Sequence, residues 1–166
     1  EDIQTEKAVT EVYDVSYIER TRVYYRAQGY EKDYVWAHNT NTPFAPLSKP
    51  LNECNAGVIV TAMPDTGEGR THRRVYSTLS SPIPKSMYTS ELSWHQSVTH
   101  TEDIGSFLPL EQLNGLVGEG VVGGIARRFY SVPTEYSQRN TIDKDAPDIL
   151  NHCHEDEIDI AILVPL

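Results

Sequence analysis

The sequence predicts a three-layer α/β fold, in which a mostly parallel sheet lies between flanking helices. The chain has 166 residues, which suits one domain or a large part of one. Three apolar runs, 56–63, 121–126 and 158–164, are continuous and rich in β-branched residues. This pattern is typical of strands that are buried on both faces. Helical patterns separate the runs, and such alternation favours parallel strands joined by right-handed crossovers.

The first expected element is a helix from Ser16 to Gln28. Ser16 and Glu19 have the spacing of a capping box, and Gly29 is a natural stop, because glycine readily takes the left-handed conformation that ends many helices. The tyrosines of this helix are expected to be packing residues with hydrated hydroxyls rather than a cofactor site.

A proline-rich stretch separates this helix from the remaining elements. Residues 39–53 contain three prolines among short polar side chains, and they are expected to form a linker or an extended wrap over the surface. We therefore expect residues 1–42 to form an N-terminal helix and extended arm, and residues 43–166 to form the α/β domain.

The α/β part is expected to alternate strands and helices after its first strand. A loop over 64–69 precedes a more exposed strand over 75–79. Leucines at helical spacing predict a helix over 110–118, directly after a proline. Asp143 is a candidate cap for a last helix that runs to about Glu155.

Parallel sheets bind ligands beyond the carboxyl ends of their strands. Those ends are expected at 63–69, 127–135 and 165–166. Arg127 and Arg128 directly follow the second strand, where a guanidinium group can bind a carboxylate bidentately or lower the pKa of a thiol. A surface or ion-pair role is the alternative for both arginines, since adjacent residues would not both face one site.

A polar loop continues from these arginines and is expected to contact a substrate. Its candidate residues carry groups that donate or accept hydrogen bonds. They are Tyr130, Ser131, Thr134, Glu135 and Tyr136.

Two histidines in the segment WHQSVTH, His95 and His100, are candidate general acids, because imidazole titrates near neutral pH. A hydrogen-bonded loop histidine is the alternative. Their spacing is not a strong metal motif and no third ligand is near, so we expect no metal site. Cys54 and Cys153 form no C-x-x-C motif and are expected to be reduced thiols.

The chain is acidic, with a formal net charge of −10. Phosphate backbones and anionic membranes attract clustered lysine and arginine, so we expect neither a nucleic-acid partner nor a membrane partner. The sequence lacks the roughly 18 consecutive apolar residues of a membrane span, and its first residues lack the pattern of a signal peptide. A cytoplasmic location is therefore expected.

Five segments of the chain carry a family resemblance. They are YIERTRVYYRAQGY, YVWAHNTNTPFAPLSKPL, AGVIVTAM, LSWHQSVTHTEDIGSFLPLEQLNGLVGEGVVGGIARRFYSVPTEYSQR and DAPDILNHCHEDEIDIAILVPL. In this order and spacing they resemble the protein B family of glycine, sarcosine, betaine and D-proline reductases, which includes selenoproteins. The resemblance covers nearly the whole chain, more firmly from Pro43 onward.

The resemblance implies an oxidoreductase subunit that uses a thiol or selenol to cleave a C–N bond reductively, together with a carbonyl-bearing partner subunit. In the family, the strand similar to IDIAILVPL is followed directly by the redox cysteine or selenocysteine. That residue would follow Leu166. We therefore expect this chain to be inactive alone and to hold no cofactor, with cysteine or selenocysteine present in a full-length form.

Several origins are open for a chain that ends at Leu166. A selenocysteine codon, UGA, read as a stop would produce this end, as would deliberate shortening, proteolysis or a naturally short homologue. The alternative function is a non-catalytic interaction or oligomerisation module, in which another chain buries the last strand's edge. A racemase-like enzyme of related fold is a third possibility, but it needs thiols at strand ends, where the sequence places none.

Overall fold

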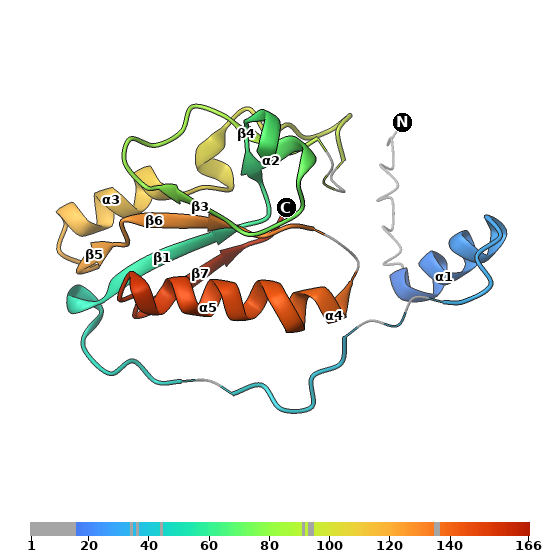
Figure 1. Ribbon diagram of the computed structural model, residues 1–166, viewed down its shortest axis with the longest axis horizontal. Helices are drawn as coiled ribbons and strands as arrows, with labels where there is room; N and C mark the ends of the chain where they lie inside the picture. Colours follow the sequence, from blue (N-terminus) through green and yellow to red (C-terminus); the bar gives the residue numbers. More distant parts are fainter. Residues whose placement is uncertain are drawn as a thin grey trace, which may run out of the picture. The chain divides into compact units, whose positions relative to one another are not determined.

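The computed structural model divides the chain into two compact units, Glu1–Thr42 and Pro43–Leu166. The structure describes residues 16–33, 35, 37–43, 45–90, 92, 95–134 and 137–166. Figure 1 shows the elements of each unit.

The N-terminal unit contains the expected helix, α1 (Tyr17–Ala27), none of whose residues is buried. Gly29 has a φ of +90°. Its N–H donates to the Arg26 carbonyl at 3.0 Å, and the Tyr30 N–H donates to the Tyr25 carbonyl at 3.2 Å. These two bonds form a Schellman motif, which confirms Gly29 as the residue that ends the helix.

The tyrosines near the end of α1 contact one another. The Tyr25 ring lies 5.5 Å from the Tyr24 ring and 5.5 Å from the Tyr30 ring, edge to face in both cases. The expected capping box is not formed, because the Ser16 side chain accepts no hydrogen bond at the helix start. The helix therefore depends on its C-terminal motif more than on its N-terminal cap.

The second unit is built around a sheet with β1 at its centre. Its strands are β1 (Asn55–Val60), β3 (Tyr76–Leu79), β5 (Gly124–Ile125), β6 (Arg128–Ser131) and β7 (Ile160–Val164). β1 pairs in parallel with β5 and β6 on one side and with β7 on the other, while β3 adds antiparallel beyond β6. The expected α/β fold with a mostly parallel sheet is confirmed.

Helices cover both faces of this sheet (Figure 1). The helical segments are the 3-10 turns η1 (Leu51–Glu53) and η2 (Ile104–Ser106), the α-helices α2 (Gly67–Thr71), α3 (Leu110–Gly118), α4 (Gln138–Asn140) and α5 (Ala146–Glu155), and the π-helical η3 (Thr141–Asp145). α3 lies on one face and α5 on the other. Right-handed crossovers place their helices on opposite faces of a sheet when two successive connections run in opposite directions across it.

The core lies mainly between the sheet and α3. Its buried side chains are Val58, Val60, Ala62, Phe107, Leu108, Leu110, Leu113 and Phe129. The α5 side is thinner, since none of the α5 residues is fully buried. A second, two-stranded sheet of β2 (Met63–Pro64) and β4 (Met87–Tyr88) stands beside the core.

Three expectations about the elements need correction. The run 121–126 is not one strand, because β5 holds only two of its residues and β6 starts after it. The run 158–164 is not a buried strand, because β7 pairs with β1 alone among the described strands and its side chains alternate between half-buried and exposed. The last helical stretch starts earlier than expected: Ser137 accepts a hydrogen bond from the Asn140 N–H, and Asp143 lies inside η3 rather than capping a helix.

Candidate functional site

The chain topology marks one place in the sheet where a ligand crevice is expected. The connection after β1 runs to the α3 face, whereas the connection after the neighbouring β6 runs to the α5 face (Figure 1). Ligands of open α/β sheets bind beyond adjacent parallel strands whose connections diverge in this way. We call the region beyond these strand ends, residues 61–66, 131–134 and 165–166, the carboxyl edge.

Two hydroxyl groups lie where strands end at the carboxyl edge. Thr61 follows β1, and its Oγ1 accepts a hydrogen bond from the Leu166 N–H at 2.9 Å. Ser131 ends β6, and its Oγ is buried with no hydrogen-bond partner in the described part of the chain. A buried hydroxyl without a partner costs free energy, so Ser131 is a position that stability alone does not explain.

Replacing Ser131 by alanine is expected to leave the free energy of unfolding unchanged or to raise it by about 1–2 kcal/mol, because no hydrogen bond is lost. Urea denaturation measures the difference. Ser86→Ala is the contrasting variant: the Ser86 hydroxyl donates to Asp65 Oδ2 at 2.9 Å, so up to about 1 kcal/mol should be lost. A clear loss for Ser131→Ala would contradict the unpaired state of that hydroxyl.

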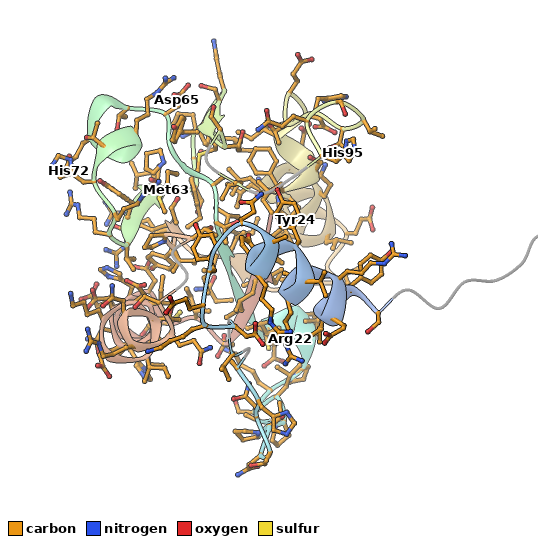
Figure 2. All side chains as sticks on the ribbon, turned by 90° about the vertical axis from the view of Figure 1, so that its right-hand side faces the viewer. Arg22, Tyr24, Met63, Asp65, His72 and His95 are labelled. Carbon is orange, nitrogen blue, oxygen red and sulfur yellow. The ribbon has the colours of Figure 1, made fainter. Side chains whose placement is uncertain are left out.

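The β2–β4 pair and α2 carry a polar cluster beyond the end of β1. The Asp65 carboxylate accepts hydrogen bonds from Arg70 Nε at 2.8 Å and from the Ser86 hydroxyl at 2.9 Å. These bonds, that from Arg70 above all, lower the pKa of Asp65. The Arg70 guanidinium also lies 5.2 Å from the centre of the Tyr88 ring. Figure 2 faces this side of the sheet and labels Asp65 among the side chains that project from it.

The α2 turn packs closely on β2 at Gly69. A Cβ at this position would lie 2.2 Å from the Pro64 carbonyl oxygen, which is backbone and cannot move aside cheaply. Gly69→Ala is therefore expected to lower the free energy of unfolding by about 1–3 kcal/mol, as measured by thermal or urea denaturation. Gly67→Ala is the matched control, because nothing lies within 4 Å of its Cβ position. Equal effects of the two variants would contradict this close packing.

Arginines that the sequence analysis did not single out lie near the carboxyl edge. Because β3 runs antiparallel to β6, its first residue lies at this edge, and the segment RTHRR leads into it. Arg74 forms an ion pair with Glu68 and lies 4.6 Å from the centre of the Tyr76 ring. These arginines follow the loop after a predicted strand in an otherwise acidic chain. This pattern could have identified them as candidate cationic residues from the sequence.

Arg127 and Arg128 do not lie at the carboxyl edge, contrary to expectation. Arg127 lies between β5 and β6, and Arg128 is the first residue of β6. β1 pairs with β5 up to Ala56 and Ile125, and it pairs with β6 from Ile59 and Tyr130 onward. Between these two pairs, β1 advances by three residues whereas the opposite segment advances by five. The two extra residues form a bulge. The strand therefore resumes at Arg128 and reaches the carboxyl edge only after Ser131.

Arg128 instead joins β6 to the end of α5. Its Nε and Nη2 donate to the Asp156 carboxylate at 2.9 and 2.8 Å, and Nη2 also donates to Glu155 at 2.9 Å. The Tyr130 hydroxyl donates to the same Asp156 at 2.5 Å. The Tyr130 ring stacks on His152 of α5 with centroids 5.2 Å apart. We call Arg128, Tyr130 and Asp156 the α5 clamp.

The α5 clamp shifts the pKa values of its members in opposite directions. The hydrogen bonds from Arg128, more than that from Tyr130, lower the pKa of Asp156. Burial first, and then the bond to Asp156, raise the pKa of Tyr130. Asp156 is therefore ionised and Tyr130 neutral at neutral pH. The structure therefore shows Arg128 in an ion pair, which was the alternative to a substrate-binding role.

The remaining candidate residues are spread over two loops. His95 starts a turn in which its carbonyl accepts the Val98 N–H at 3.0 Å, and His100 is exposed near the end of the same loop. Thr134 is exposed beyond β6 at the carboxyl edge. Glu135 and Tyr136 lie outside the described residues. Of the substrate candidates, Ser131 and Thr134 thus lie at this edge, whereas Arg127, Arg128 and Tyr130 precede it.

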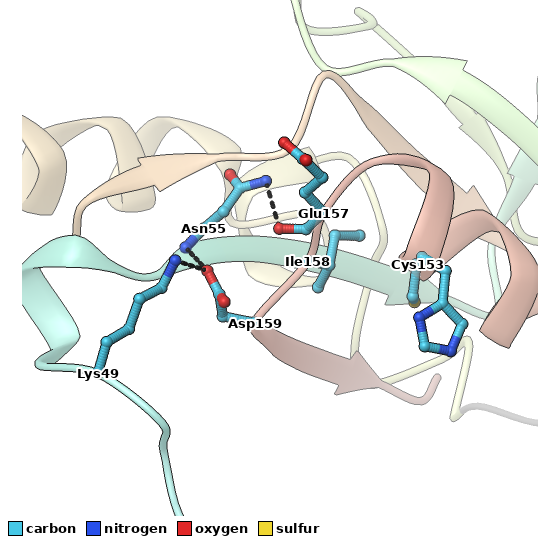
Figure 3. Close-up of a pocket in the computed structure, with 7 residues that line it drawn as sticks. Lys49, Asn55, Cys153, Glu157, Ile158 and Asp159 are labelled. Atoms are coloured by element: carbon cyan, nitrogen blue, oxygen red, sulfur yellow. Dashed lines mark hydrogen bonds and ion pairs between the residues drawn. The ribbon is translucent and has the colours of Figure 1, made fainter.

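A polar pocket of about 540 Å³ lies at the opposite, amino end of β1 and β7 (Figure 3). It is lined by Lys49, Asn55, Cys153, His154, Glu157, Ile158 and Asp159. Asp159 accepts hydrogen bonds from Lys49 Nζ and from the Asn55 N–H, both at 2.7 Å. Asn55 Nδ2 in turn donates to the Asp156 carbonyl at 2.9 Å. Because these groups bind one another, the pocket joins the segment before η1, the start of β1 and the end of α5.

Glu157 in this pocket has a left-handed backbone, with a φ of +49°. The Ile158 N–H donates to the Cys153 carbonyl at 2.9 Å and the Glu157 N–H to the His154 carbonyl at 3.2 Å. This is again a Schellman motif, with glutamate where glycine is favoured.

Glu157→Gly is therefore expected to raise the free energy of unfolding by about 0.5–1 kcal/mol, since glycine adopts a positive φ without a Cβ penalty. Thermal denaturation of the purified variants measures the gain. Glu157→Ala is the control, because it removes the carboxylate and keeps the Cβ. A gain of equal size in both variants would assign the effect to charge rather than to backbone conformation.

The described part of the chain contains no cluster of three His, Cys, Asp or Glu side chains that could hold a metal ion. Both cysteines are free thiols, and burial raises the pKa of Cys153. Among the described residues, no helix is both long and apolar enough to traverse a lipid bilayer.

Comparisons of the chain with family models, with curated proteins and with solved structures found no match.

Proposed function

We propose that this chain forms the scaffold and substrate-side surface of a reductase component similar to protein B of the glycine, sarcosine, betaine and D-proline reductases. The position of Leu166 carries the proposal. Its N–H donates to Thr61 Oγ1 at 2.9 Å, and its side chain packs against the core on the α3 face. A residue joined directly to Leu166 would thus start beside the end of β1, at the carboxyl edge.

A thiolate or selenolate at that position would be the nucleophile of the reaction. The thiolate or selenolate attacks the carbon that carries the amine, so a C–S or C–Se bond forms while the C–N bond breaks and the amine takes up a proton and leaves. A dithiol then attacks the sulfur or selenium, the carbon takes up a proton with the electron pair of the C–S or C–Se bond, and the dithiol ends as a disulfide. Arg70 and Arg74 are paired with Asp65 and Glu68, but their side chains stay 54% and 58% exposed, against 24% for Arg128. Their guanidinium groups can therefore favour a thiolate at this edge and attract the carboxylate of an amino-acid substrate. Thr134, which is exposed, is the substrate contact that we retain from the sequence, whereas the Ser131 side chain is fully buried and lies beneath this edge.

The α5 clamp has a different role in this proposal. Arg128 and Tyr130 are bound to Asp156, so they hold α5 in place instead of touching substrate. His95 and His100 remain candidate proton donors. The component works in the cytoplasm with other reductase subunits, including the one that bears the carbonyl group.

The first test is the codon after Leu166 in the source gene. A cysteine codon, or a UGA codon with an open frame beyond it, is the expected result. A stop followed by no coding frame would contradict the proposal.

The second test is enzymatic. The 166-residue chain, given a dithiol and each of the four substrates, is expected to show no reductive cleavage. A form that continues through the codon after Leu166 should turn over one of them when combined with its partner subunits. Serine in place of the redox residue is the matched control and should abolish turnover. Comparable turnover by the 166-residue chain would place the chemistry elsewhere.

A further inference from the structure

We propose that the free edge of β7 pairs with β7 of a second copy of this chain, so that two sheets join into one. β7 (Ile160–Val164) pairs with β1 on one side only. On its other side β1 pairs with β5 and β6, and no described strand pairs with the outer side of β7. An open strand edge presents unpaired N–H and C=O groups, which are a template for another strand.

The backbone of β7 shows which groups face the open side. The Ala126 N–H donates to the Ala56 carbonyl at 2.8 Å and the Val132 N–H donates to the Val60 carbonyl at 2.9 Å, so the even-numbered residues of β1 face β5 and β6. In the register that pairs Ala56 with Ile160, the odd-numbered residues of β1 therefore bond to Ile160, Ile162 and Val164. Ala161 and Leu163 direct their N–H and C=O groups outward. A two-fold axis beside Ile162, perpendicular to the sheet, would pair Ile162 with its own copy and Ala161 with Leu163 of that copy. Both outward-facing residues would then be hydrogen-bonded.

The side chains of β7 lack the devices that protect natural sheet edges. The strand IAILV holds no charge and no proline, and its register with β1 is unbroken over five residue pairs. Ile162 and Val164 pack against the core, so Leu163 points to the α5 face, where it is 70% exposed. β3, at the far edge, instead follows Arg73 and Arg74 closely and contains serine and threonine, and β5 has only two residues. Among the described strands, β7 is thus the only edge of more than two residues that is apolar and unprotected.

The charges beside β7 allow a second copy to pair in the antiparallel arrangement. The nearest charge to β7 is Asp159, just before the strand. In the two-fold pairing, the Asp159 residues of the two copies lie at opposite ends of the joined strands, roughly 20 Å apart, which exceeds the screening length of about 8 Å in physiological salt. Each is also neutralised by its own Lys49 at 2.7 Å. The remaining opposition is the overall charge of −10 per chain, so added salt should strengthen the dimer.

The interface is small, so we expect a weak dimer. Paired five-residue strands, with Leu163 and the 56% exposed Leu150 of α5 beside them, bury less than the roughly 1,600 Å² of a typical stable complex. Dissociation at roughly micromolar concentrations is expected.

The test is sedimentation velocity of the 166-residue chain over a wide concentration series, with two single variants and their combination. Ala161 and Leu163 of opposite copies face each other in the proposed pairing, at hydrogen-bonded positions where their side chains are direct cross-strand neighbours. Ala161→Glu and Leu163→Lys each place two like charges near the axis. Each should raise the dissociation constant by roughly tenfold or more, while both positions are exposed and circular dichroism should be unchanged.

The combined Ala161→Glu/Leu163→Lys variant should recover dimerisation, because each glutamate then faces a lysine of the other copy. A mixture of the two single variants should form mixed dimers for the same reason. A chain that stays monomeric at high concentration would overturn the proposal. So would dimerisation that the single variants leave unchanged, or that the double variant does not recover, since the interface would then lie elsewhere.

Discussion

Replacing Asp156 by alanine is expected to lower the free energy of unfolding by about 2–4 kcal/mol. The Asp156 side chain is 10% exposed and binds Arg128 at 2.8 Å, and it accepts the Tyr130 hydroxyl at 2.5 Å. Alanine would leave a half-buried guanidinium and a buried phenol without their acceptor. Removing one partner of a buried pair costs more than the pair itself contributes. Urea denaturation followed by circular dichroism measures the loss.

This loss is expected to depend on pH. The pKa of Asp156 is lowered in the folded protein, so the group contributes stability above its unfolded-state pKa of about 3.9 and loses it as the pH falls through the folded-state pKa. The difference between wild type and Asp156→Ala should therefore be largest near neutral pH and shrink below about pH 4. A difference that stayed constant over this range would contradict a role of the ionised carboxylate.

Asp148→Ala is the matched control for the α5 clamp. Asp148 lies in the first turn of the same helix and is exposed. It interacts with the helix dipole only, so its replacement should cost less than about 1 kcal/mol. A loss as large as that of Asp156→Ala would show that charge on α5, rather than the clamp, sets the stability.

Replacing Phe129 by alanine is expected to cost about 3–5 kcal/mol. Phe129 is fully buried and lies in the core cluster with Val60 of β1 and Leu110 of α3. The variant loses the transfer free energy of the ring and leaves a cavity that the sheet and α3 cannot fill. Because Phe129 lies two residues before Ser131, a shift of β6 should also appear in the amide signals of the carboxyl edge.

Phe129→Leu is the control, since it keeps an apolar side chain in the same place and should cost less than about 1.5 kcal/mol. Urea denaturation of the three proteins gives both differences. If the alanine variant were as stable as the leucine variant, Phe129 would not occupy the packed core that the structure shows.

Much of the fold follows from local patterns in the sequence. Leucine spacing predicts α3 within its observed bounds, Leu110–Gly118, and a glycine at a positive φ ends α1 where expected. The β-branched run predicts β1, and the shorter run 75–79 predicts β3. These elements are predictable because their own residues determine them.

The position of the arginines could not be predicted in this way. Arg127 and Arg128 follow an apolar run, which suggests a strand end, but two extra residues bulge between β5 and β6. A bulge is defined by the partner strand, which a single run of sequence does not contain. For this reason we propose the arginines around α2, instead of Arg128, as the cationic groups of the site.

The exposure of β7 has the same kind of cause. Its composition is that of a buried strand, and apolar runs of this length do not distinguish a central strand from an edge strand. Only the pairing with β1 alone reveals the edge. The Ser131 hydroxyl was predicted as a substrate contact from its place after an apolar run, but its lack of a partner is visible only in three dimensions.

The proposed function depends most on substrate binding at the carboxyl edge. Titration of the ¹⁵N-labelled 166-residue chain with glycine, sarcosine, betaine and D-proline tests this directly, with amide chemical shifts as the readout. We expect at least one of these compounds to shift signals of the carboxyl edge, including Thr61, Ser131 and Leu166, and to leave those around Asn55 and Asp159 unchanged. Shifts confined to the polar pocket at the amino end of β1, or no shift at the carboxyl edge with any of the four, would contradict the account.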